Sequence, residues 1–74
     1  MASFKIDVRG ECCPTPVLKT KKQLNEMKPG DIVEILVTDQ LAPLDIEALV
    51  SVTKDKFVSA VKETDHTKVI VEKS

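Results

Sequence analysis

Alternating apolar and polar residues predict four β-strands along the chain. The predicted strands cover residues 4–8, 32–38, 57–63 and 68–72. The second strand is rich in β-branched residues, with Val33, Ile35 and Val37 on one face and further apolar residues on the other, so it is expected to be an inner strand. The polar residues 64–67 between the last two strands suit the turn of a hairpin.

Helical spacing replaces alternation after the first strand. Residues 14–27 are predicted to form a helix that lies on the sheet, because apolar or small residues recur three or four positions apart. These residues are Val17, Thr20, Leu24 and Met27. The stretch Lys28-Pro29-Gly30 ends the helix, since proline cannot continue it and glycine accepts turn geometries that other residues avoid.

A second, shorter helix is predicted between the inner strand and the hairpin. Residues 39–44 are expected to form a loop, in which Pro43 could introduce the first turn of the helix. The apolar side of the helix then carries Ile46, Leu49 and Val50. The polar pair Lys54-Asp55 is expected to end it.

The predicted element order is βαβαββ, without a repeat or a linker. Because a crossover between strands is almost always right-handed, the first two strands should be parallel with the first helix on one face, and the second helix should cover the same face. The predicted fold is a two-layer α+β sandwich with a four-stranded mixed sheet. A chain of 74 residues has room for one domain, residues 1–74, which buries roughly 60% of the surface of the unfolded chain.

Composition and charge narrow the function classes. A net charge of -1 gives no general attraction to nucleic acid or anionic lipid, so partner proteins must be recognised locally. The longest apolar run, residues 35–37, is far shorter than the about 18 residues of a membrane span, and no signal peptide is visible. We therefore expect a cytoplasmic protein that is a monomer when free and that has no room for a deep cofactor cavity.

The two cysteines, Cys12 and Cys13, are neighbours. A disulfide between them would close no loop and would strain the peptide that joins them, so a reducing compartment fits. Two adjacent thiols with a single, distant histidine, His66, make a poor zinc site, and no metal is expected. His66 is expected to lie on the hairpin rather than to activate a cysteine, and the glycine count of 2 excludes a Gly-rich phosphate loop.

The candidate site is Cys13-Pro14-Thr15-Pro16, which follows a turn at Gly10. Pro14 biases Cys13 toward an extended backbone and suits the first helical position itself, but Pro16 could take that position with Thr15 as the cap. With either start, Cys13 is expected at the positive end of the helix, which favours the thiolate.

These residues resemble the defining pattern of the TusA-like (SirA-like) family of sulfur carriers. The resemblance rests on Asp7, Arg9-Gly10, the Cys-Pro-x-Pro element with Val17, and the pairs Pro29-Gly30, Thr38-Asp39 and Asp45-Ile46. It implies a fold like the C-terminal domain of translation initiation factor three. It also implies that Cys13 carries sulfur as a persulfide, with Pro14 and Pro16 shaping the helix start.

The resemblance further implies partners. Family members receive sulfur from cysteine desulfurases or rhodanese-like proteins and give it to relays for tRNA thiolation, molybdenum-cofactor maturation or sulfur oxidation. Such a protein is a carrier and only loosely an enzyme. One departure is Leu44, where the tRNA-thiolation members resemble one another in having a basic residue.

Several roles stay open at the level of the sequence. Cys12 is either a small apolar residue or an auxiliary thiol that releases the persulfide sulfur or senses oxidation. The basic residues Lys19, Lys21 and Lys22 are either a solvated face or a surface that steers an acidic partner to Cys13. The alternative function is a redox-responsive regulatory or docking module, whereas a thiol oxidoreductase usually needs Cys-x-x-Cys.

Overall fold

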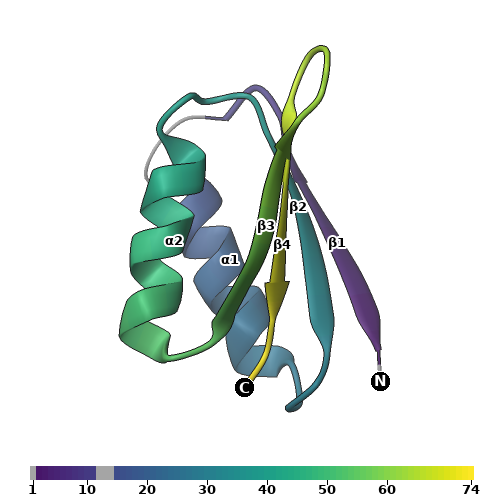
Figure 1. Cartoon of the computed structure of the whole chain (residues 1–74), viewed down its shortest axis with the longest axis vertical. Helices are drawn as coiled ribbons and strands as arrows, with labels where there is room; N and C mark the ends of the chain where they lie inside the picture. Colours follow the sequence, from purple (N-terminus) through teal and green to yellow (C-terminus); the bar gives the residue numbers. More distant parts are fainter. Residues whose placement is uncertain (1, 12–14) are drawn as a thin grey trace.

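The computed structural model describes residues 2–11 and 15–74. Its elements follow the predicted order βαβαββ (Figure 1). They are β1 (Ser3–Val8), α1 (Thr15–Glu26), β2 (Ile32–Val37), α2 (Ala42–Thr53), β3 (Lys56–Lys62) and β4 (Thr67–Glu72). The predicted α+β class and element order are therefore confirmed.

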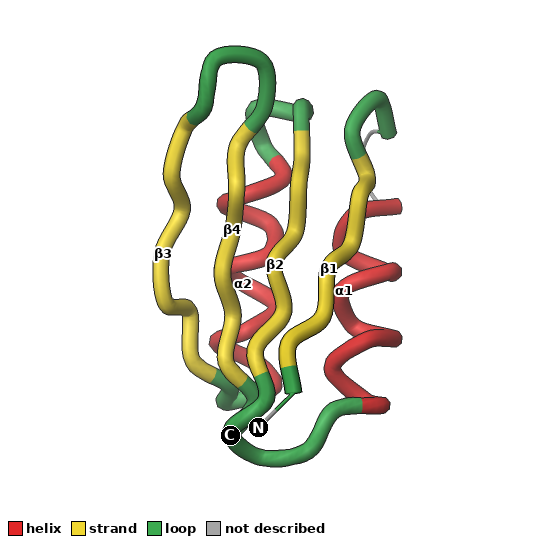
Figure 2. Tube along the Cα trace, turned by 90° about the vertical axis from the view of Figure 1, so that its right-hand side faces the viewer, coloured by secondary structure: helices red, strands yellow, loops and turns green. Residues whose placement is uncertain are grey.

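The strands form one mixed sheet in the order β1-β2-β4-β3 (Figure 2). β1 and β2 are parallel and in register, with Val8 opposite Val37 at the end of both strands. β4 is antiparallel to both β2 and β3. β2 is thus an inner strand, as its apolar composition predicts, and the β1-α1-β2 crossover makes its neighbour parallel.

Both helices lie on the same face of the sheet, so the molecule has two layers (Figure 1). The core lies between the layers, and Val33, Ile35 and Val37 of β2 are fully buried in it. Leu24 of α1 and Ile46 of α2 pack into the same cluster. For β2, α1 and α2, the apolar face predicted from the sequence is therefore the face that is buried in the core.

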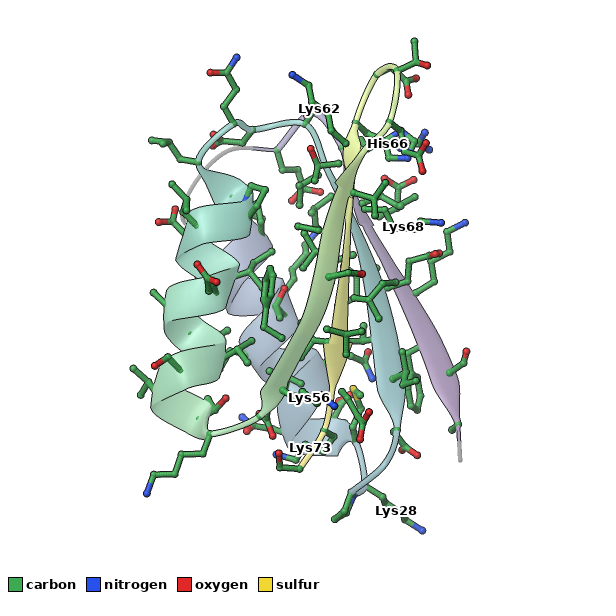
Figure 3. All side chains as sticks on the ribbon, in the orientation of Figure 1. Lys28, Lys56, Lys62, His66, Lys68 and Lys73 are labelled. Atoms are coloured by element: carbon green, nitrogen blue, oxygen red, sulfur yellow. The ribbon has the colours of Figure 1, made fainter. Side chains whose placement is uncertain are left out.

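The other face of the sheet carries charged side chains. Lys68 of β4 extends on the side away from the helices (Figure 3) and lies 3.6 Å from the carboxylate of Glu34 on β2. Lys5 of β1 is opposite Glu34 on the other side. Leu36, which is opposite Lys68 on this face, is only 7% exposed.

The predicted start of the second helix is wrong by a few residues. Residues 42–44, expected in a loop, form the first turn of α2, with Pro43 in that turn as predicted. The carboxylate of Asp39 accepts a hydrogen bond from the N–H of Leu41, and the carbonyl of Asp39 accepts one from Ala42. This side-chain turn starts the helix before its apolar periodicity begins.

The end of α2 also differs from a glycine-type stop. Lys54 has a left-handed backbone with a φ of 63°, and its N–H donates a hydrogen bond to the carbonyl of Val50, which closes the helix.

None of the helices in the described part of the chain is long and apolar enough to cross a membrane.

Candidate functional site

The candidate site is joined to one end of the sandwich. β1 and β2 end there side by side, and the described part of α1 and α2 begins there (Figure 1). The site residues Cys12, Cys13 and Pro14 lie outside the described residues. The flanking residues Glu11 and Thr15 are described, so the surroundings of the motif can be built from them.

The turn after β1 is held to the end of β2. Gly10 has a φ of +83°, a backbone conformation that residues with a Cβ rarely adopt. Its N–H donates a hydrogen bond of 2.8 Å to the hydroxyl of Thr38, just beyond β2. The N–H of Glu11 donates to the carbonyl of Val8. The predicted turn at Gly10 is therefore present, and Thr38 fixes it although the sequence pattern gave Thr38 no such role.

Arg9 and Asp7 form a bidentate ion pair beside this turn. The Nε and Nη2 atoms of Arg9 donate to the two carboxylate oxygens of Asp7 at 3.0 and 2.8 Å. These side-chain hydrogen bonds, with one from the backbone N–H of Arg9, lower the pKa of Asp7 to about 2. The same contact raises the pKa of Arg9, helped by the charge of Asp65 on the hairpin. The pair keeps its charges at any ordinary pH.

The first turn of α1 is packed into the protein. Pro16 is buried, and its carbonyl accepts a hydrogen bond of 2.8 Å from the hydroxyl of Thr20, which is itself fully buried. Pro16 therefore lies in the first turn of the described helix, while the part that Pro14 plays in its start lies outside the described residues. The last residue of the cysteine motif, Pro16, is therefore packed into the protein.

The three lysines of α1 have different surroundings. Lys19 donates a hydrogen bond of 2.9 Å to the carboxylate of Glu11. This ion pair joins the residue just before the two cysteines to α1. Lys22 lies with Lys19 in a shallow hollow against Ile6 of β1. Lys21 is exposed, and neither it nor Lys22 has an ion pair within residues 2–11 and 15–74. The sequence had not indicated Glu11 as the partner of Lys19.

His66 lies on the hairpin between β3 and β4, as predicted (Figure 3). Its Nδ1 is 2.7 Å from a carboxylate oxygen of Asp65. With Thr38 and Gln40 it lines a hollow of about 210 Å³ at the same end of the sheet. Within the described residues, no three His, Cys, Asp or Glu side chains are grouped so that they could hold a metal ion.

Leu44, the residue that departs from the family pattern, lies in the first turn of α2 and is 62% exposed. It therefore faces solvent at the end of the molecule to which the cysteine motif is joined. An apolar side chain in this place is available for contact with another protein rather than for the core.

Comparisons with known proteins agree on one family. Residues 4–73 match the family model described as Sulfurtransferase TusA. The sulfur carrier protein TusA of Allochromatium vinosum is 30% identical over 76 residues, covering 100% of both chains. YrkF of Bacillus subtilis is 34% identical over 62 residues, which cover 84% of this chain but only 34% of YrkF.

The fold has a solved counterpart. The SirA-like protein from Desulfitobacterium hafniense superposes with a TM-score of 0.84 at 24% identity, covering 93% of this chain and 95% of that protein. At this identity the likeness concerns the fold. The family model, which spans nearly the whole chain, decides the relationship: the chain belongs to the TusA sulfurtransferase family.

Proposed function

We propose that this protein is a sulfur carrier that accepts sulfur on Cys13 as a persulfide and passes it to an acceptor protein. The observation that carries the proposal is family membership over residues 4–73, which include the Cys13-Pro14-Thr15-Pro16 element. A relative matched over its whole length is itself a sulfur carrier protein. The donor is a cysteine desulfurase or a rhodanese-like protein of the cytoplasm.

The transfer needs one nucleophile and no change in the overall oxidation state. The thiolate of Cys13 attacks the outer sulfur of a persulfide on the donor, a new S–S bond forms on Cys13, and the donor cysteine leaves as its thiolate. In the second half, a thiolate of the acceptor attacks the outer sulfur on Cys13. The Cys13 thiolate then leaves, and the carrier returns to its starting state.

The described residues support this chemistry. A helix N-terminus favours a nearby negative charge, which is the form of sulfur that attacks and leaves. The Gly10 turn is tied to Thr38, and the Lys19–Glu11 ion pair spans the motif. In the proposal, Gly10, Pro14 and Pro16 shape the loop, and Cys12 serves as an auxiliary thiol or as packing.

The test is a load-and-chase experiment. The protein is incubated with a cysteine desulfurase and ³⁵S-labelled cysteine, freed from the donor, and then mixed with an acceptor protein that has a reduced cysteine. We expect the label first on the carrier and then on the acceptor, with loading removed by a reducing agent. A protein that takes up no label from desulfurase, either directly or through a rhodanese-like donor, would contradict sulfur carriage and favour the redox-responsive docking module.

A further inference from the structure

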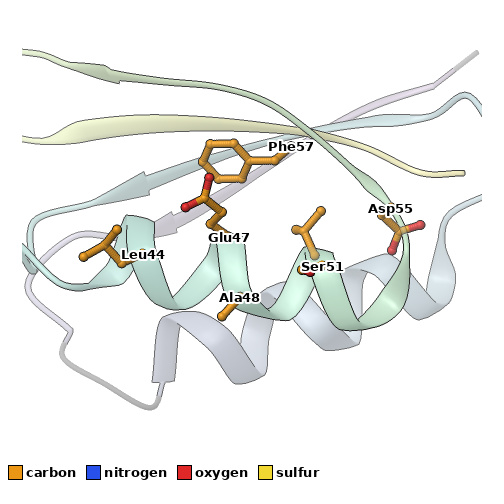
Figure 4. Close-up of a pocket in the computed structure, with 7 residues that line it drawn as sticks. Leu44, Glu47, Ala48, Ser51, Asp55 and Phe57 are labelled. Atoms are coloured by element: carbon orange, nitrogen blue, oxygen red, sulfur yellow. The ribbon is translucent and has the colours of Figure 1, made fainter.

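A groove runs between α2 and β3 (Figure 4). It has a volume of about 510 Å³ and is open to solvent along its length. Its lining comprises Leu44, Glu47, Ala48, Val50, Ser51, Asp55 and Phe57. Glu47 and Ala48 lie three and four positions after Leu44, and Ser51 lies four and three positions after them, so these side chains form one stripe along the helix.

The lining combines apolar side chains with a single available negative charge. The ring of Phe57 packs against the core and forms a firm floor, and Ala48 and Ser51 are small enough to leave the space above it open. Glu47 extends from α2 toward β3 beside Phe57 (Figure 4). Within the described residues, no hydrogen bond or ion pair engages the Glu47 carboxylate.

The other carboxylate of the groove, that of Asp55, is already engaged. It accepts hydrogen bonds from the hydroxyl of Thr53 at 2.7 Å and from the N–H of Ser74 at 3.0 Å, and Lys73 lies 3.6 Å away. Its side chain is only 2% exposed. A ligand in the groove would therefore meet the charge of Glu47 and not that of Asp55.

β3 is an edge strand, but its edge is poorly suited to pairing with another strand. A bulge shifts its register between Phe57 and Ser59. Lys56 and Lys62 also stand at its two ends. Bulges and terminal lysines are common means by which proteins protect sheet edges from strand addition. A partner would therefore bind through side chains placed in the groove.

The groove is continuous with the end of the molecule that carries the cysteine motif. Leu44 lines the groove and lies in the first turn of α2, and Leu41, just before that turn, is 60% exposed. Both α2 and the described part of α1 begin at this end (Figure 1). A protein that reaches Cys13 for sulfur exchange could thus extend onto the groove.

We propose that the α2–β3 groove docks a segment of the protein that receives sulfur from this chain, and that this segment places an apolar side chain over Phe57 next to a basic residue that pairs with Glu47. The identity of the occupant rests on the proposed sulfur carriage. The chemistry of the occupant follows from the groove itself: an apolar floor with one unpaired carboxylate selects an apolar anchor beside a positive charge.

The probe is a short synthetic helical peptide that presents leucine and arginine on adjacent turns, with a control peptide in which arginine is replaced by glutamate. Each is titrated into the ¹⁵N-labelled protein. We expect amide shift changes centred on Leu44, Ala48, Ser51 and Phe57 with the arginine peptide, and about tenfold weaker binding of that peptide to Leu44→Ser. Glu47→Lys should reverse the preference between the two peptides.

Matched controls separate the groove from the surface in general. Val52→Ser changes an apolar residue of α2 that is 80% exposed and does not line the groove, and Glu26→Lys reverses an exposed charge on α1. Both should bind the arginine peptide as the parent does. Equal binding of the two peptides, shift changes elsewhere on the protein, or no binding would overturn the proposal.

Loading of the same parent samples by a cysteine desulfurase separates this proposal from the proposed function. A parent that loads sulfur but does not bind the arginine peptide would refute the groove and leave sulfur carriage standing. A parent that binds the peptide but does not load would keep the groove as a docking surface. In that case the protein that occupies the groove would not be one that receives sulfur from this chain.

Discussion

Asp31 is the residue whose side chain ties the N-terminus to the rest of the molecule. Although a carboxylate, it is only 7% exposed, and it accepts hydrogen bonds from the N–H groups of Ala2 and Lys28 at 2.9 and 3.0 Å. Together these bonds hold the start of β1 against the turn before β2. Both bonds involve a charged acceptor, which makes them stronger than neutral ones.

We predict that Asp31→Asn lowers the melting temperature by several degrees, because an amide has one acceptor oxygen and places an NH₂ group against one of the two N–H donors. Thermal unfolding followed by circular dichroism measures the change. Asp65→Asn is the matched control, since Asp65 is exposed and its carboxylate contacts the side chain of its neighbour His66. An equal effect of both substitutions would contradict the role given to Asp31.

The carboxylates also set how stability depends on pH. Hydrogen bonds from Ala2 and Lys28 lower the pKa of Asp31. Burial alone would raise the pKa of Asp55, but the bonds from Ser74 and Thr53 and the charge of Lys73 lower it overall. A carboxyl group whose pKa is lower in the folded chain stabilises it fully above the unfolded pKa, about 3.9. That stabilisation is lost as the pH falls through the folded value.

We therefore predict that the melting temperature changes little between neutral pH and about pH 5 and falls below about pH 4. A series of thermal melts across this range measures it. The fall should be shallower in Asp31→Asn, which no longer has that carboxyl group to protonate. A melting temperature that begins to fall near neutral pH, or that has the same acid dependence in the variant, would contradict this assignment.

At the scale of elements, α1 is the helix that follows the cysteine motif, and it carries three lysines, Lys19, Lys21 and Lys22. Lys19 is held by Glu11, so Lys21 and Lys22 are the charges left to act on a partner. Exposed charges raise the rate of encounter through long-range attraction, which salt screens. Lys21→Glu with Lys22→Glu should slow sulfur uptake from a cysteine desulfurase several-fold at low salt and much less at high salt.

Uptake rates measured over a salt series test this prediction. Lys54→Glu with Lys56→Glu, two exposed lysines where α2 ends and β3 begins, makes the same change in net charge and serves as the control. If the two double variants are equally slow, net charge alone explains the effect. If both match the parent, the lysines of α1 are only a solvated face.

Elements were predictable from the sequence where one physical signal dominates. β2 is rich in apolar residues because it lies inside the sheet with Val33, Ile35 and Val37 in the core, and α1 has one apolar stripe because it covers one face. The start of α2 was not predictable from periodicity, since the turn around Asp39 depends on a side-chain hydrogen bond. The bulge in β3 was missed for a similar reason: no residue type in that strand marks it.

The bulge changes which side chains share a face. Simple alternation from Phe57 would place Val61 on the same side as Phe57. In the structure the register shifts after Phe57, so Ala60 is opposite the buried Val69 and Val61 is opposite Lys68 on the open face. Val61 is 47% exposed as a result. The faces of Ala60 and Val61 could therefore not have been derived from the strand pattern.

At the scale of the whole molecule, the topology gathers the proposed chemistry at one end. Parallel β1 and β2 end together, and the turn after β1 is bonded to Thr38 beyond β2. The sequence pointed to the cysteine motif and to the Gly10 turn. It did not reveal Thr38 and Glu11 as the residues that hold the flanks of the motif, because both contacts join segments that only the fold brings together.

The central claim is that a single residue, Cys13, carries the sulfur. The most direct measurement is site-resolved mass spectrometry after loading by a cysteine desulfurase with cysteine, on the parent, Cys12→Ser and Cys13→Ser. We predict an added sulfur on Cys13 in the parent and in Cys12→Ser, and none on Cys13→Ser. An added sulfur on Cys12 in Cys13→Ser, or its loss from both variants alike, would contradict single-cysteine carriage and make the adjacent thiols one site.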